Sequence, residues 1–132
     1  MSEKKKHEPE YTFHILYTKH PETGTAVTAF IVQTVREFVS FKYEIPLVSK
    51  IEGQQIHVRI HGLRVPENLV PGKGQARGTI YHRRLKGKFE LAITNVDGVL
   101  NKFLANFTNR SIEVKRSSRN PFIVYIPERI QT

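Results

Sequence analysis

The sequence predicts a mainly β protein, an antiparallel β barrel or sandwich with one helix late in the chain. Short runs in which apolar and polar side chains alternate recur along the chain, which is the pattern of half-buried strands. Glycine-containing turns separate several of these runs. Strand and helix patterns do not alternate along the chain, as they would in a protein with a parallel sheet. A length of 132 residues fits one domain with its own core. The alternative is an α+β domain with a further helix at about 25–40.

The first ten residues differ in composition from the rest of the chain. They are mostly charged and hold no apolar run, so residues 1–10 are predicted to be a disordered tail and 11–132 a single β-rich domain. A start of this kind is neither a signal peptide nor a membrane span, and no membrane partner is expected. The chain has no cysteine, which excludes thiol catalysis and disulfides and fits a cytoplasmic location.

The first strand is predicted from Tyr11 to Tyr17, where every second residue is aromatic or aliphatic. The next segment, 25–39, is ambiguous because its apolar residues also fit a helical stripe. Many of its residues are β-branched, and nothing resembling a helix C-cap separates it from the following strand. We therefore predict strands here, with the helix as the alternative.

A first hairpin is predicted between the runs 41–47 and 55–61. Apolar residues occupy the odd positions of the first run and the even positions of the second. The pair Glu52-Gly53 offers a two-residue turn, because glycine accepts positive φ. This turn would pair Leu47 with Val58 and would place both apolar rows on one face.

A second hairpin is predicted around Lys86-Gly87 by the same reasoning. Its strands would pair His82 with Leu91 on the inner face of the sheet. On the outer face, Arg83 would lie opposite Glu90 as an exposed cross-strand pair.

The late helix is predicted over 97–107. Six apolar residues between positions 96 and 107 recur with the helical period of 3.6 residues, and Asn95 or Asp97 can cap the first turn. Two short strands, at 111–115 and 122–126, are predicted after the helix from their alternating patterns.

The positive charge is concentrated in one stretch of the chain. The formal net charge is +9, and residues 57–119 hold thirteen Lys or Arg against four Asp or Glu, a difference of +9. A basic region attracts polyanions, of which nucleic acid is the commonest, so we predict non-catalytic binding of a polyanion and of nucleic acid first. The alternative is a protein-interaction or assembly domain that meets an acidic protein partner.

The candidate contacts are cations of this stretch together with one tyrosine. Tyr81 and Arg83 share a strand face about 6.6 Å apart, so a ring that stacks on a base would lie beside a phosphate contact. The predicted nucleic-acid-binding residues are Arg59, Arg64, Lys73, Arg77, Tyr81, Arg83, Arg84, Lys86 and Lys88.

No catalytic, metal or cofactor site is predicted. Asp97 is the only aspartate, which excludes paired-aspartate catalysis, and His82 has no evident partner acid. His57 and His61 stand about 13 Å apart on an extended strand, too far to share one metal ion. The glycines of 71–78 lead into a strand, whereas a nucleotide-binding loop needs a helix at that point.

Overall fold

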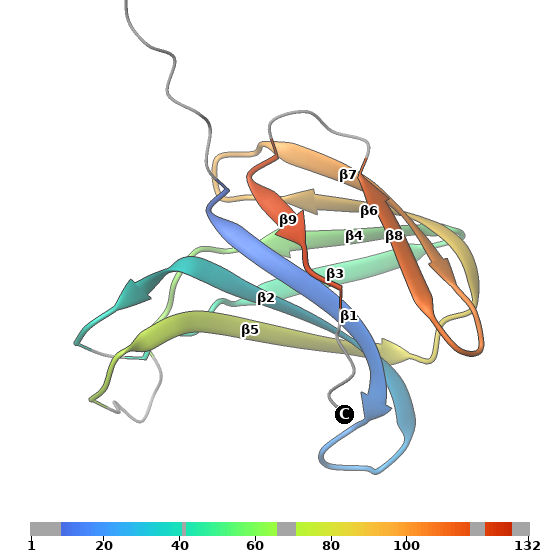
Figure 1. Cartoon of the computed structure of the whole chain (residues 1–132), viewed down its shortest axis with the longest axis horizontal. Coiled ribbons are helices and arrows are strands. Elements are labelled where there is room, and N and C mark those ends of the chain that lie inside the picture. The colour runs from blue at the N-terminus through green and yellow to red at the C-terminus, as the bar shows by residue number, and fades with distance from the viewer. Residues whose placement is uncertain (1–8, 41, 66–70, 117–120, 128–132) are drawn as a thin grey trace, which may run out of the picture.

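The computed structural model describes residues 9–40, 42–65, 71–116 and 121–127 (Figure 1). In this described part nine strands form two sheets that are not closed into a barrel, which confirms a mainly β fold and makes it a sandwich. The strands are β1 (Tyr11–Lys19), β2 (Ala26–Phe38), β3 (Leu47–Glu52), β4 (Gln55–Ile60), β5 (Gly74–Arg83), β6 (Gly87–Thr94), β7 (Leu100–Phe107), β8 (Ile112–Arg116) and β9 (Ile123–Tyr125).

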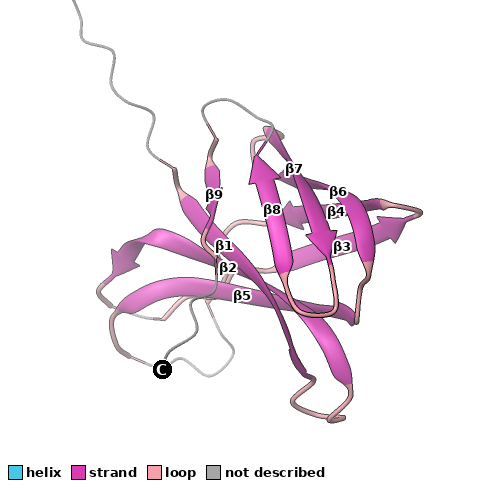
Figure 2. Cartoon of the chain, turned by 45° about the vertical axis from the view of Figure 1, so that its right-hand side comes forward, coloured by secondary structure: helices cyan, strands magenta, loops and turns pink. Residues whose placement is uncertain are grey.

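The two sheets differ in size. The first sheet has the strand order β5-β2-β1-β9, and the second has the order β3-β4-β6-β7-β8. Neighbouring strands are antiparallel except for two parallel pairs, β1 with β9 and β4 with β6. Figure 2 shows β9 beside β1 and β8 at the outer edge of the second sheet.

The chain enters the first sheet at β1, which confirms the strand predicted from Tyr11. Glu10 is tied down just before it, since its amide donates to the Phe122 carbonyl over 2.8 Å and its carbonyl accepts from the Val35 amide over 3.0 Å. The remainder of the predicted tail, residues 1–8, lies outside the described residues.

The core lies between the sheets and consists of the alternate side chains that each strand turns inward. Phe13 and Phe30 come from the first sheet and Phe103 and Phe107 from the second, and all four are at most 2% exposed. The rings of Phe13 and Phe103 meet edge-on with centroids 4.9 Å apart, which joins the two sheets directly. Burial of one such side chain contributes about 1.5–3 kcal/mol.

The ambiguous segment after β1 is a strand, so the alternative of a helix at 25–40 is wrong. β2 is thirteen residues long and pairs with β1 in an unbroken antiparallel register from Tyr11 opposite Thr34 to Lys19 opposite Ala26. Its β-branched side chains suit this surface, where they alternate between the core and the outer face. The high content of β-branched residues therefore predicted this segment correctly, whereas the helical spacing of its apolar residues was misleading.

The first predicted hairpin is present as β3 and β4, but β3 shares only Leu47 with the predicted run 41–47, and the pairing is displaced by one residue in each strand. Leu47 lies opposite Ile60 rather than Val58, because the two-residue turn is Gly53-Gln54, with φ +58° at the glycine. The displacement keeps odd positions opposite even ones, so the inward side of both strands is the predicted one.

The second predicted hairpin is wrong, because β5 and β6 belong to different sheets. Arg83 therefore lies opposite Val27 of β2, and it is not opposite Glu90. Leu85 is 1% exposed between the two strands, and its amide donates to the buried Thr28 hydroxyl over 3.0 Å. This buried residue carries the chain across the sandwich, where the sequence pattern alone suggested a simple reversal.

The predicted helix at 97–107 is also wrong, since most of this segment is β7. The Asn95 side-chain oxygen accepts from the amides of Asp97 and Val99, so it closes a tight turn instead of capping a helix. Phe103 and Phe107 fit both a helical stripe and one face of a strand. Four of the six apolar residues of the stripe are instead 44–55% exposed, namely Val96, Val99, Leu100 and Leu104.

Asn101 explains why the alternation in β7 was hidden. It lies on the inward face beside Phe103 but is polar, and it is only 3% exposed. Its side-chain oxygen accepts hydrogen bonds from the amides of Phe122 over 2.8 Å and Ile123 over 3.4 Å. A single buried amide group therefore holds the start of β9, which corresponds to the second short strand predicted after residue 111, against the opposite sheet.

Gly78 marks the closest backbone approach along the other side of the sandwich. The segment before β3 crosses β5 there, and the Ile45 amide donates to the Arg77 carbonyl over 3.1 Å. A Cβ atom at position 78 would stand 2.1 Å from the Ile45 carbonyl oxygen, closer than real side chains come. Glycine is required at this position because the neighbouring strand leaves no room for a side chain.

We predict that Gly78→Ala lowers the free energy of unfolding by about 3 kcal/mol, because the Ile45 backbone must move to admit the methyl group. The exposed neighbour Thr79→Ala serves as the control and should cost less than about 1 kcal/mol. Urea unfolding followed by circular dichroism measures both values. Equal losses would show that the close approach at residue 78 is unimportant.

For Asn101→Ala we expect a loss of about 2–4 kcal/mol, since two buried amides lose their acceptor. Asn106→Ala, half-buried on the outer face of the same strand, is the matched variant and should lose far less. Amide hydrogen exchange should also speed up at Phe122 and Ile123 in the first variant only. Unchanged protection there would contradict the role given to Asn101.

Candidate functional site

The structure distributes the predicted nucleic-acid-binding residues over several surfaces. Alternation along β5 places Arg77, Tyr81 and Arg83 on the outer face of the first sheet. Arg59 and Lys88 are exposed on β4 and β6 of the second sheet, on the opposite side of the molecule. The nine predicted residues therefore do not form one continuous patch.

Several of these residues are already occupied by contacts within the chain. Arg64 forms an ion pair with Glu44 over 2.7 Å, which cancels its charge locally. The Arg77 guanidinium donates to the Gln33 side-chain oxygen over 2.8 and 3.1 Å. The Tyr81 ring lies 4.8 Å from the ring of His20, which leaves part of its face covered.

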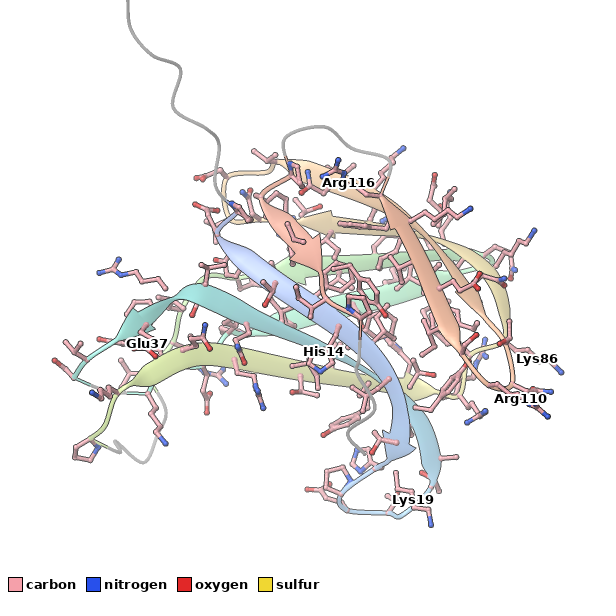
Figure 3. The ribbon with its side chains drawn as sticks, in the orientation of Figure 1. His14, Lys19, Glu37, Lys86, Arg110 and Arg116 are labelled. Carbon is pink, nitrogen blue, oxygen red and sulfur yellow. The ribbon has the colours of Figure 1, made fainter. Side chains whose placement is uncertain are left out.

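Other cations do gather at the end of the sandwich where the chain crosses between the sheets. Arg83 is the last residue of β5, Arg84 and Lys86 come from the connection between β5 and β6, and Arg110 comes from the turn between β7 and β8. Figure 3 shows Lys86 and Arg110 together at this end, far from Arg116. We call these four residues the basic end; all four side chains are exposed.

Arg84 is the anchored member of the basic end. Its guanidinium carbon lies 4.0 Å from the centre of the Tyr17 ring, and one guanidinium nitrogen donates to the Asn109 carbonyl over 3.2 Å. The Tyr17 hydroxyl in turn donates to the Thr108 carbonyl over 2.7 Å. Burial raises the pKa of Tyr17, with Arg84 acting in the opposite direction, so the ring stays neutral under the guanidinium at physiological pH.

The turn that carries Arg110 is held in one conformation by Thr108. The Thr108 amide donates to the Ser111 carbonyl over 2.9 Å, and the Thr108 hydroxyl oxygen accepts from the Ser111 amide over 3.0 Å. This local network fixes the backbone from which the Arg110 side chain extends.

Electrostatically, the basic end is a cluster of uncompensated positive charge. None of its four cations forms an ion pair with another described residue, in contrast to Arg64 with Glu44 and Lys50 with Glu52. Exposed like charges raise the local potential and favour the approach of an anion. The arrangement suits contacts to phosphate, because Arg and Lys donate charge-assisted hydrogen bonds to its oxygens.

The predicted binding residues do not include Arg110, or Tyr17, which supports Arg84. The contacts that recruit them span 25 residues between Arg84 and Asn109 and 91 residues between Tyr17 and Thr108. No local pattern links positions so far apart, and only the crossing at Leu85 brings them together. The sequence does place Arg110 in a basic group with Lys115, Arg116 and Arg119, but it gives no sign that Arg110 lies at the same end as Arg84.

Lys88 belongs to a different environment, an open groove on the outer face of the second sheet. The groove has a volume of ≈ 620 Å³ and is lined by residues of the β3–β4 turn and of β6, β7 and β8. Its charged side chains are two lysines and two glutamates, Lys88, Lys115, Glu90 and Glu113. Opposite charges balance here, so this groove does not extend the basic end.

The glycine-rich stretch gives little support to a phosphate site. The Gly72 amide is used within the chain, since it donates to the Ser40 carbonyl over 3.2 Å. From Gly74 onward the chain enters β5, so no helix N-terminus follows the glycines. Residues 66–70, which begin this loop, lie outside the described residues.

His82 is a half-buried structural residue that joins the sheets. One ring nitrogen lies 2.8 Å from the Ser49 hydroxyl of β3, and the ring meets Phe30 edge-on with centroids 5.5 Å apart. Burial first, and Arg83 second, lower the pKa of His82 below 6.5. No carboxylate contacts the ring within the described part of the chain, and no group of three metal-ligating side chains is present there.

We predict that stability falls when the pH drops below about 6.5, because the unfolded chain then binds a proton that folded His82 resists. The loss should occur between that pH and the lower pKa of folded His82. In His82→Gln, which keeps a polar side chain opposite Ser49, the loss should be smaller. Urea unfolding across this pH range provides the measurement. Equal pH dependence in wild type and His82→Gln would contradict the assignment.

The comparisons with known proteins assign no family to this chain. Its sequence matches no protein-family model, and no curated protein or solved structure matches it. In the residues that the structure describes, no helix has the length and apolar character needed to cross a membrane.

Proposed function

We propose that this protein binds nucleic acid without catalysing a reaction, and that the basic end is the principal contact. The observation that carries the proposal is the presence at one end of the sandwich of four exposed cations, Arg83, Arg84, Lys86 and Arg110, none of which forms an ion pair with another described residue. Phosphate groups of the backbone supply the matching negative charge.

The geometry supports a division of labour among these cations. Arg84 is held against Tyr17 and Asn109, so its remaining guanidinium protons are presented in a fixed direction. Lys86 and Arg110 are longer-range, adaptable contacts that follow the irregular spacing of phosphates. Preorganisation of one donor lowers the conformational entropy lost on binding, and the flexible pair accommodates different sequences.

A path for a single strand leads away from the basic end along the outer face of β5. Arg83 and Tyr81 share this face about 6.6 Å apart, close to the spacing of neighbouring nucleotides in an extended strand. A base that stacks on the partly exposed Tyr81 ring would continue the contact beyond the phosphates. Binding through phosphate and stacking predicts weak sequence preference.

The proposal predicts that Lys86→Glu/Arg110→Glu weakens binding of a short single-stranded DNA or RNA at least about tenfold. The plot of log affinity against log salt concentration should also become shallower by about 1.4, because about 0.7 is lost for each phosphate contact. Fluorescence anisotropy of a labelled oligonucleotide at several salt concentrations measures both quantities.

The matched control is Arg59→Glu/Lys73→Glu, which changes the net charge equally but lies away from the basic end. This control should lower affinity only slightly, because it reduces the net positive charge of the protein and hence its long-range attraction for the oligonucleotide. Equal losses in the two double variants would remove the basic end as the site, and absence of binding by wild type at low salt would remove the function. Retention of polyglutamate with no retention of oligonucleotide would instead identify an acidic protein partner.

A further inference from the structure

Among the described residues, β8 is the last strand of the second sheet and pairs only with β7. Within that part of the chain its other edge is free. The Ser111 carbonyl accepts from Thr108 and therefore faces β7, as do the backbone groups of residues 113 and 115 by alternation. The amides and carbonyls of Ile112, Val114 and Arg116 consequently point away from the sheet, available to another strand.

The inward side of this edge is incompletely covered. In the part of the chain that the structure describes, β9 has only three residues whereas β1 has nine, so the described first sheet is short beside β8. Two hollows of ≈ 290 and ≈ 310 Å³ lie in this region, and Tyr125 and Pro127 line both of them. β8 contributes Val114 to one hollow and Ile112 to the other, and both residues are only partly buried. Most residues that line these hollows are apolar, with Arg116 in the first and Arg110 and Ser111 in the second, so a further strand beside β8 would find space for its inward side chains.

The outward side of the same edge carries two opposite charges. Glu113 and Lys115 are exposed and stand two residues apart on one face of β8. Neither forms an ion pair with another described residue. An added strand would be favoured when it sets a cation opposite Glu113 and an anion opposite Lys115.

We propose that β8 pairs with β8 of a second copy of this chain, antiparallel and with the two-fold axis at Val114. In this register Glu113 of each copy lies opposite Lys115 of the other. The sequence of β8 itself therefore supplies the complementary strand, and the second sheets of both copies join into one continuous sheet.

Backbone phase and charge select this register together. Centring the pair on Val114 sets the outward-pointing backbone groups of residues 112, 114 and 116 against one another, so all of them find partners. Moving the axis to residue 113 would oppose two glutamates, and moving it to residue 115 would oppose two lysines. Like charges directly opposite are destabilising, so the register centred on residue 114 is preferred.

The same pairing places the inward residues of β8 beside the hollows and limits the assembly to two copies. Ile112 of one copy lies opposite Arg116 of the other, next to the hollow lined by Phe103 and Val124, and adds apolar surface there. Both copies use the same edge, so the interaction closes at a dimer and leaves no β8 edge exposed.

Charge reversal at the edge tests the dimer, with sedimentation equilibrium over a wide range of protein concentration as the measurement. Glu113→Lys and Lys115→Glu should each raise the dimer dissociation constant at least about tenfold, because each opposes like charges twice. The double variant Glu113→Lys/Lys115→Glu exchanges the two charges and should restore dimerisation to within about threefold of wild type.

These variants distinguish pairing at the β8 edge from an effect of net charge on association. The two single variants change the net charge in opposite directions, so net repulsion between copies cannot explain a loss in both. Circular dichroism checks that each variant is folded, and Val114 amide exchange should slow as wild-type concentration rises. A wild-type protein that stays monomeric up to its solubility limit would overturn the proposal. So would single variants that dimerise like wild type, or a double variant that does not recover.

Discussion

The hydrogen bond from the Leu85 amide to the Thr28 hydroxyl is the contact on which the arrangement of this molecule depends. It is buried, it is 3.0 Å long, and it stands where the chain leaves the first sheet for the second. Because Leu85 is fixed in the core, its neighbours Arg84 and Lys86 must turn to the surface at the end of the sandwich. A hairpin at this point would have kept β6 in the first sheet and moved both cations onto a flat sheet face, away from Tyr17.

Much of the fold was accessible from the sequence wherever local chemistry and periodicity agree. β1, β2 and the hairpin of β3 with β4 follow from alternation, β-branched residues and a glycine turn. Two predictions, the second hairpin and the helix at 97–107, were wrong because a polar side chain occupies a buried position where an apolar one would be expected. Thr28 provides the acceptor that permits the crossing at Leu85, and Asn101 interrupts the apolar row of β7. Neither role is written in local sequence, since each depends on a partner more than twenty residues away.

The surface exposure of the cations was predictable from the sequence, and their grouping only in part. The excess charge in 57–119 correctly pointed to cations on the surface, and Arg83, Arg84 and Lys86 are all exposed where the chain leaves β5. Charge counting could not tell that Arg64 is neutralised by Glu44 or that Arg77 is tied to Gln33. It also could not find Arg110, because the turn that carries it reaches this end through the order of strands in the sheets. Topology therefore selects which charges act together.

Two surfaces of different character result from this topology. The basic end carries like charges without partners, which suits a polyanion, whereas the β8 edge carries balanced charges in a fixed phase, which suits a strand. The central claim, that the basic end receives nucleic acid, is tested most directly by an amide chemical-shift titration with a short single-stranded oligonucleotide. The account predicts the largest shifts at residues 83–86 and 108–111, decreasing with salt. Shifts centred on Arg59 or Arg77, or none at low salt, would contradict it.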